Sequence, residues 1–92
     1  METKQLEFTQ EERTIIAEYI FSYQTGVLIK GDALSVLDLF YKKELITKEL
    51  YEHLDEDVMN NKNDISTKIA RLMSDKIPYE MKNKIMQEYY GG

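Results

Sequence analysis

Apolar residues recur along the chain at intervals of three and four positions, which is the spacing of one face of an α-helix. In the first segment this pattern follows a capping box, in which Thr9 and Glu12 can satisfy each other's free amides at a helix start. Gly26 marks the other end, because glycine accepts the left-handed conformation that is common just past a helix. The first predicted helix therefore spans residues 10–24.

The next part of the chain predicts a connector and a second helix. Asp32 is expected to cap this helix, which runs through Lys43 and is apolar around most of its circumference. A helix of that kind is central, so we predict that Leu37 and Phe40 are among the most buried side chains. Residues 27–29, Val-Leu-Ile, have no strand to pair with and are predicted to be a buried extended connector.

Three further helices are predicted in the second half of the chain. Thr47 is expected to cap a helix over residues 48–59, and Asp64 to cap a fourth helix after a polar turn. Pro78 has no amide hydrogen, which suits the first turn of a helix, so the fifth helix is predicted at 78–90. These elements predict an all-α fold, a compact bundle of four to five short helices.

Length and composition agree with one folded domain. The chain has 92 residues, within the range of about 50–250 that single domains occupy. Hydrophobic residues make up 42% and charged residues 32%, which is typical of a globular protein and not of a disordered one. We predict a single helical domain over 1–92, with flexible ends at 1–7 and at 91–92, where the glycine pair frays from the last helix.

The sequence also carries signals about its compartment. There is no cysteine, which excludes disulfides, thiolate metal sites and cysteine nucleophiles and fits a reducing compartment. The first nine residues are polar and acidic, without the basic start and apolar stretch of a signal peptide. The longest strongly apolar segment, 33–41, is shorter than the about 20 residues that cross a bilayer. We therefore expect a cytoplasmic protein with no membrane partner.

Charge is distributed unevenly along the chain. Residues 1–61 hold six basic and thirteen acidic side chains, a net charge of −7, whereas residues 62–92 hold six basic and four acidic ones, a net charge of +2. An acidic surface repels the phosphate backbone of nucleic acids, whose affinity for proteins comes mainly from cations. Nucleic-acid binding is thus disfavoured for most of the chain, although the carboxyl-terminal part remains a candidate.

The third predicted helix holds the densest cluster of polar residues. As a solvated surface it is the candidate site for a protein partner, which would comprise Glu49, Tyr51, Glu52, Asp55, Glu56 and Asp57. Glu49 and His53 have a spacing that metal ligands can take, but this is the only histidine and no second such motif occurs. Residues 55–66 also lack the glycine and glutamate of a calcium loop. We predict no metal site and no cofactor.

Catalytic motifs are missing from the sequence. No serine lies in a strand-turn-helix elbow, and His53 has no nucleophile near it in the chain. The glycines do not form a phosphate-binding loop. The chain is therefore predicted not to be an enzyme.

Basic residues near the carboxyl end support an alternative function. If the last two helices formed a helix-turn-helix, the residues facing nucleic acid would be Lys68, Arg71, Lys76, Lys82 and Lys84. Against this, Asp75 falls where such motifs generally have an apolar residue. The five basic residues are explained equally well as the ordinary solvated surface of two helices.

Seven tyrosines in 92 residues also indicate a contact surface, because tyrosine buries area yet tolerates water. By their spacing, three are predicted at the edge of the core, namely Tyr19, Tyr23 and Tyr89. Three others fall outside the apolar stripes and are candidates for an exposed contact surface, namely Tyr51, Tyr79 and Tyr90. An equally good interpretation is that they shield a thin core.

Residues 34–54 show one local resemblance. Their spaced leucines, followed by Leu45-Ile46-Thr47 and by Glu49-Leu50-Tyr51, resemble the short helical hairpin called SHOCT. The glycine that the SHOCT pattern has before Leu45 is Glu44 here, and a capped helical hairpin of any origin produces a similar pattern. The resemblance implies a small interaction or oligomerisation module without catalytic residues.

Together these observations favour a small, non-catalytic, cytosolic protein-interaction module. A sharper hypothesis is a regulator or inhibitor from a phage or mobile element, whose acidic helix face occupies a basic, nucleic-acid-binding surface on a partner protein. The alternative is a dimeric, helix-turn-helix-like DNA-binding transcriptional regulator that uses the basic residues of 68–84. The apolar second helix and residues 27–29 also suggest a homodimer with these segments near the interface.

Overall fold

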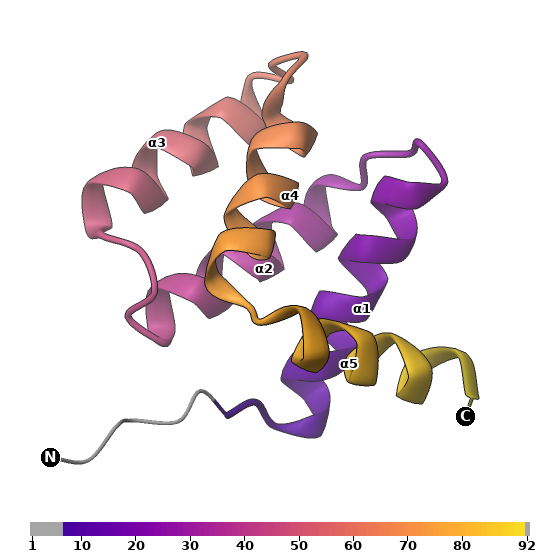
Figure 1. Ribbon diagram of the computed structural model, residues 1–92. Coiled ribbons are helices and arrows are strands. Elements are labelled where there is room, and N and C mark those ends of the chain that lie inside the picture. Colours follow the sequence, from indigo (N-terminus) through magenta and orange to yellow (C-terminus); the bar gives the residue numbers. More distant parts are fainter. Residues whose placement is uncertain (1–6, 92) are drawn as a thin grey trace, which may run out of the picture.

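The structure, a computed structural model, describes residues 7–91 as five helices with no strand among them (Figure 1). The helices are α1 (Gln10–Gln24), α2 (Lys30–Lys42), α3 (Lys48–Met59), α4 (Ile65–Lys76) and α5 (Tyr79–Gly91). The prediction of an all-α bundle is confirmed. The ends predicted to be flexible fall mostly on residues 1–6 and 92, which lie outside the described residues.

Helix α1 begins and ends where its capping signals predict. The amide of Thr9 donates to Glu12 Oε1 at 2.8 Å, and the amide of Glu12 donates to Thr9 Oγ1 at 3.2 Å. Beyond the carboxyl end, Gly26 has a φ of 78°, a left-handed conformation that has no steric cost for glycine. The first predicted helix is confirmed at both boundaries.

Helix α2 begins earlier than predicted. Its first residue is Lys30, and no side chain caps its amino end. Asp32 is not the cap but lies in the first turn, where its Oδ2 accepts a hydrogen bond from Ser22 Oγ of α1 at 3.1 Å. A carboxylate in the first turn is also favoured by the helix dipole, so the acidic residue marks the region of the helix start but not the boundary. The helix ends at Lys42.

The segment 27–29 lies outside any helix or strand, as predicted, but most of it is not buried. Val27 is 55% exposed and Ile29 is 49% exposed, whereas Leu28 packs against the core. Successive side chains of an extended segment point to opposite sides, so the core covers only the middle one. The prediction of a buried connector is therefore wrong for the two outer residues.

Both boundaries of α3 and the start of α4 agree with the prediction, although only one predicted cap forms its hydrogen bond. Thr47 Oγ1 accepts from the amide of Leu50 at 3.1 Å, which caps α3. Asp64 directly precedes α4, but its side chain makes no capping hydrogen bond. Its Oδ2 lies instead 3.6 Å from the Nζ of Lys68, one turn further along the helix.

Proline sets the break between α4 and α5. Ile77 is extended, with φ −114° and ψ 121°, because proline disfavours the helical conformation in the residue before it. Pro78 directly precedes α5, and its carbonyl oxygen accepts from the amide of Lys82 at 2.9 Å. Helix α5 thus begins one residue later than predicted. It includes Gly91, which was expected to fray, whereas Gly92 lies outside the described residues.

Helix α2 is the centre of the core and packs against both α1 and α3. Leu37 and Phe40 are fully buried, as predicted. Among the apolar residues of α2 only Tyr41 is largely exposed, and its ring stacks on that of Tyr51. The surrounding helices of one chain therefore cover α2, and the reason for placing this helix in a homodimer interface no longer applies.

The other helices pack less evenly around this centre. Helix α4 contacts α3 and α1, and α5 lies across α1 (Figure 1). Helices α4 and α5 are consecutive in the chain yet have little contact with each other. The described part of the molecule measures 38 × 35 × 19 Å. No helix among residues 7–91 combines the length and the apolar character that crossing a membrane requires.

Candidate functional site

Three carboxylates of the predicted partner-binding cluster lie together on the outer side of α3. Glu49, Glu52 and Glu56 are all exposed, and none makes an ion pair with another described residue. Leu54 and Val58, on the opposite side of the helix, are buried and fix its orientation. We call these three glutamates, together with the half-buried Asp55, the acidic face of α3.

Asp57 belongs to the packing of the bundle and not to the acidic face. Asp57 is only 8% exposed, and its Oδ2 lies 3.4 Å from Lys68 Nζ of α4 and 3.5 Å from His53 Nε2. The ion pair with Lys68 links α3 to α4. The spacing contained a signal for this position, because Asp57 follows the apolar residues Leu50 and Leu54 by seven and three positions.

Tyr51 is also engaged within the bundle and is not freely exposed as predicted. Its hydroxyl donates a hydrogen bond to Asp38 Oδ1 of α2, and its ring stacks on Tyr41 with centroids 4.8 Å apart. The hydrogen bond to the carboxylate favours the protonated phenol and raises the pKa of Tyr51 to about 12. Tyr51 therefore joins α2 to α3 at the edge of the acidic face.

The single histidine lies beside the acidic face of α3. His53 is exposed, and the one carboxylate of the described residues that lies within 4.0 Å of it is that of Asp57, at 3.5 Å. Among residues 7–91, no group of three His, Asp or Glu side chains is arranged to hold a metal ion.

The basic residues of the alternative hypothesis do not form one surface. Lys68 pairs with Asp57 and Asp64, and Lys76 lies 3.8 Å from the carboxylate of Asp75. The last two, Lys82 and Lys84, lie on different sides of α5. Lys82 lines a groove towards α4, whereas Lys84 lines a separate hollow.

Arg71, the remaining basic candidate, is exposed on α4. Asp75 follows it by four positions and therefore lies on the same side of the helix. Two of the five basic candidates, Lys68 and Lys76, are thus close to carboxylates, whereas no ion pair among the described residues involves the other three.

The remaining tyrosine candidates are exposed, as predicted. Tyr79 is 71% exposed and Tyr90 is 61% exposed. Tyr90 forms an aromatic cluster with Phe21 and Tyr89, whose ring centroids lie 6.1 Å and 5.6 Å from that of Tyr90. This cluster joins the ends of α1 and α5.

Two of the three tyrosines predicted at the core edge are largely exposed, and one is fully buried. Tyr23 is 42% exposed and Tyr89 is 41% exposed. Tyr19 is 1% exposed, and its hydroxyl donates to the carbonyl oxygen of Ser66 at 3.0 Å. Burial raises the pKa of Tyr19 above its usual value.

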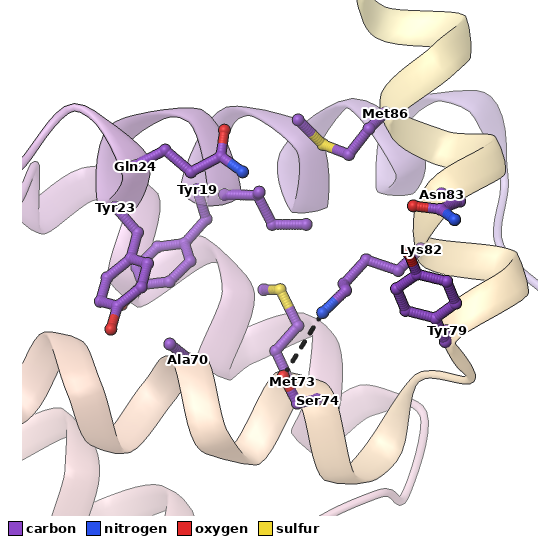
Figure 2. A pocket seen from close by; sticks show the side chains of 11 residues that line it. Tyr19, Tyr23, Gln24, Ala70, Met73, Ser74, Tyr79, Lys82, Asn83 and Met86 are labelled. Atoms are coloured by element: carbon purple, nitrogen blue, oxygen red, sulfur yellow. Dashed lines mark hydrogen bonds between the residues drawn. The ribbon is translucent and has the colours of Figure 1, made fainter.

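A groove of about 340 Å³ lies between α1, α4 and α5, and no pattern in the sequence predicted it. Figure 2 shows the apolar side chains of Met73 from α4 and Met86 from α5 facing this space, with Tyr23 and Gln24 of α1 along one side. Lys82 reaches across it, and its Nζ lies 3.4 Å from Ser74 Oγ. The groove exists because α4 and α5 diverge after Pro78. No local sequence pattern predicts the angle between these two helices.

Comparison with known proteins gives no family assignment: no family model matches the chain, and neither a curated protein nor a solved structure matches it. The SHOCT-like segment therefore stays a resemblance. The structure does show that Glu44, where that pattern has glycine, adopts a φ of 61°. This left-handed conformation is one that glycine adopts without strain.

Proposed function

We propose that this chain is a small, non-catalytic protein-interaction module that binds a basic surface of a partner protein through the acidic face of α3. The observation that carries the proposal is the exposure of three neighbouring glutamates, Glu49, Glu52 and Glu56, without a cation paired to them among the described residues. Uncompensated charges of one sign attract a complementary surface and accelerate its association.

An exposed apolar side chain beside these charges favours a protein over a simple cation as the partner. Met59 is 56% exposed and follows Asp55 and Glu56 by four and three positions, which places it on the same side of α3. A flexible thioether adapts to partner surfaces and adds contact area that a dissolved cation cannot use. The acidic face thus combines charge with an apolar contact at its carboxyl end.

The same surface suggests a sharper form of the proposal. The partner's basic surface is one that binds nucleic acid, and the carboxylates of α3 occupy it in place of phosphates. The chain would then act as a regulator or inhibitor, as expected for a protein of a phage or mobile element. What supports this form is the charge of the surface together with the small size of the domain.

Charge reversal on α3 tests the proposal against a matched control. The test variant is Glu49→Lys/Glu52→Lys/Glu56→Lys, and the control is Glu11→Lys/Glu18→Lys/Glu80→Lys, three exposed glutamates on α1 and α5. Each changes the net charge from −5 to +1, since every reversal adds two. Both should fold, because an exposed substitution typically changes stability by no more than about 0.5 kcal/mol.

Binding is measured by affinity purification of the tagged chain from cells of its native source, with quantitative mass spectrometry. We expect a protein that the wild type and the control retain and that the α3 variant loses, with weaker retention at higher salt. Equal retention by both variants would contradict the proposal. Binding to DNA that is lost on neutralising Arg71, Lys82 and Lys84 would support the alternative of a DNA-binding regulator.

A further inference from the structure

Most of the large apolar side chains that are exposed lie away from α3, and two of them, Tyr23 and Tyr79, line the groove between α1, α4 and α5. Nine large hydrophobic side chains are exposed in the described part of the chain. Seven of them belong to the end of α1, the following connector and α5, namely Phe21, Tyr23, Val27, Ile29, Tyr79, Tyr89 and Tyr90. This concentration identifies a second surface, which the acidic face does not explain.

The groove has the size and the lining of a binding site. Its volume of about 340 Å³ lies within the about 300–1,000 Å³ that is usual for ligand sites. Its floor is formed by Tyr19 and Met73, which are 1% and 2% exposed, whereas Ile20 and Met86 are half-buried at its walls. A smaller hollow of about 150 Å³ shares Tyr19 and Tyr23 with the groove and continues it to the connector after α1.

The aromatic cluster extends the groove in the other direction. Tyr90 follows Met86 by four positions, which places both on one side of α5. The ring of Tyr90 in turn lies next to that of Phe21 of α1, with their centroids 6.1 Å apart. The apolar surface is therefore elongated, which suits a segment of protein better than a small molecule.

The charge of the groove is opposite to that of the whole chain. Among its eleven lining residues, Lys82 is the only one with a formal charge, whereas the chain carries a net charge of −5. Lys82 makes no ion pair with any described residue, and the one hydrogen bond of its side chain to a described residue is the 3.4 Å contact with Ser74. The groove thus offers a mainly apolar lining, with the polar side chains of Gln24, Ser74 and Asn83 in it, and one cation that can pair with a carboxylate.

We propose that this groove docks an amphipathic α-helix of a partner protein, which places a carboxylate beside Lys82. A helix satisfies its backbone hydrogen bonds internally, so it can enter an apolar groove without leaving polar backbone groups unpaired. Apolar side chains at positions i, i+3 or i+4, and i+7 would occupy the groove, as in other helix-in-groove complexes. The methionines and tyrosines of the lining provide the adaptable contacts that such binding uses.

The probe is a display library of amphipathic helical peptides of about 16 residues, which gives about four turns. The apolar stripe is fixed, the flanking positions are random, and the target is the full chain. The counter-target is Ala70→Glu, which puts a carboxylate into the groove lining. We expect peptides enriched in Asp or Glu beside the stripe, selected by the wild type and not by the counter-target.

Two variants on α5 then test where the carboxylate lies. For a selected peptide, Lys82→Glu should weaken binding about tenfold in fluorescence anisotropy, because an attraction becomes a repulsion. Lys84→Glu makes the same charge change on the same helix outside the groove, and it should leave the affinity unchanged. NMR spectra of the wild type should show the largest shifts on peptide addition at Ala70, Met73 and Met86.

Several results would overturn this proposal while leaving that for α3 intact. One is the absence of enrichment over the counter-target, and another is enrichment of Lys or Arg beside the stripe. Equal effects of the two lysine variants would also contradict it. Sedimentation that shows a dimer for the wild type and a monomer for Ala70→Glu would assign the groove to a second copy of the chain.

Discussion

Helices α2 and α5 both pack against α1 and each has 13 residues, yet they contribute differently to the bundle. Helix α2 buries five side chains: Ala33, Val36, Leu37, Leu39 and Phe40. Helix α5 buries only Ile85. One helix is thus surrounded by its neighbours, while the other rests on them with most of its surface uncovered.

The residue types on the two helices fit this difference. The buried positions of α2 are aliphatic or phenylalanine, which close-pack without any polar group to satisfy. The apolar residues of α5 are mainly tyrosine and methionine, which tolerate water and adapt to varied contacts. We infer that α2 determines stability, whereas α5 and the groove beside it can change with little cost to the fold.

Truncation of one side chain on each helix should give the largest contrast. Leu37→Ala removes a fully buried side chain and should destabilise the domain by about 2–5 kcal/mol. This is a large part of the about 5–15 kcal/mol that stabilises a native protein. Met86→Ala, in the wall of the groove, should cost about 1 kcal/mol or less. Urea unfolding followed by circular dichroism measures both, and equal costs would contradict a central α2.

Enlarging one alanine of α2 and one alanine of the groove should give the next largest difference in stability. Ala33 of α2 is fully buried, so Ala33→Leu would overpack the core and should cost about 1–3 kcal/mol. Ala70 of α4 faces the groove, where a leucine has room, so Ala70→Leu should change stability by about 0.5 kcal/mol or less. A strongly destabilised Ala70→Leu would mean that the groove is closed in solution.

The sequence predicted the features that depend on neighbouring residues. The caps at Thr9 and Thr47 need only the next three residues, and both helix starts agree with the structure. The buried positions Leu37 and Phe40 followed from the apolar character of a single helix.

Features that depend on the relative placement of two helices were not predicted. The spacing of Asp57 indicates the packed side of α3, but its ion pair forms only because α4 brings Lys68 next to it. Tyr51 is bound because α2 brings Asp38 next to it. The groove depends likewise on the angle between α4 and α5, so the helical periodicity of each segment does not contain it.

The turn after α2 offers a smaller test. Although α2 is the best-packed helix, the turn that follows it holds one residue in an unfavourable backbone conformation. Glu44 has a φ of 61°, a conformation that costs a residue with a side chain about 1 kcal/mol or more. Glu44→Gly removes this strain but makes the unfolded chain more flexible, so the net gain should be up to about 1 kcal/mol.

The turn after α3 provides the control for this change. Asn61 has a φ of 55°, but asparagine tolerates the left-handed conformation, so Asn61→Gly should change stability by only about 0.5 kcal/mol or less. Thermal unfolding of both variants measures the difference. An unchanged or lower melting temperature for Glu44→Gly would show that the turn is not strained.

The smallest difference between the two regions concerns single hydrogen bonds of tyrosines. Tyr51 joins α3 to α2 through its hydrogen bond to Asp38, whereas the exposed tyrosines of α5 make no side-chain hydrogen bond to α4. The pKa of Tyr51 is raised to about 12, mainly because its hydroxyl donates to the Asp38 carboxylate. The folded state therefore keeps this proton when the unfolded chain has lost it. The resulting stabilisation is complete below pH about 10, the usual pKa of tyrosine, and is lost as the pH rises from about 10 through about 12.

Asp38→Asn removes the charge and should lower the pKa of Tyr51 towards its usual value. The difference in tyrosinate absorbance between each protein and its Tyr51→Phe variant isolates this titration. Asp75→Asn, an equivalent change at an exposed position of α4, should leave it unaltered. A Tyr51 titration that is the same with and without the Asp38 carboxylate would show that the two helices are not joined by this bond.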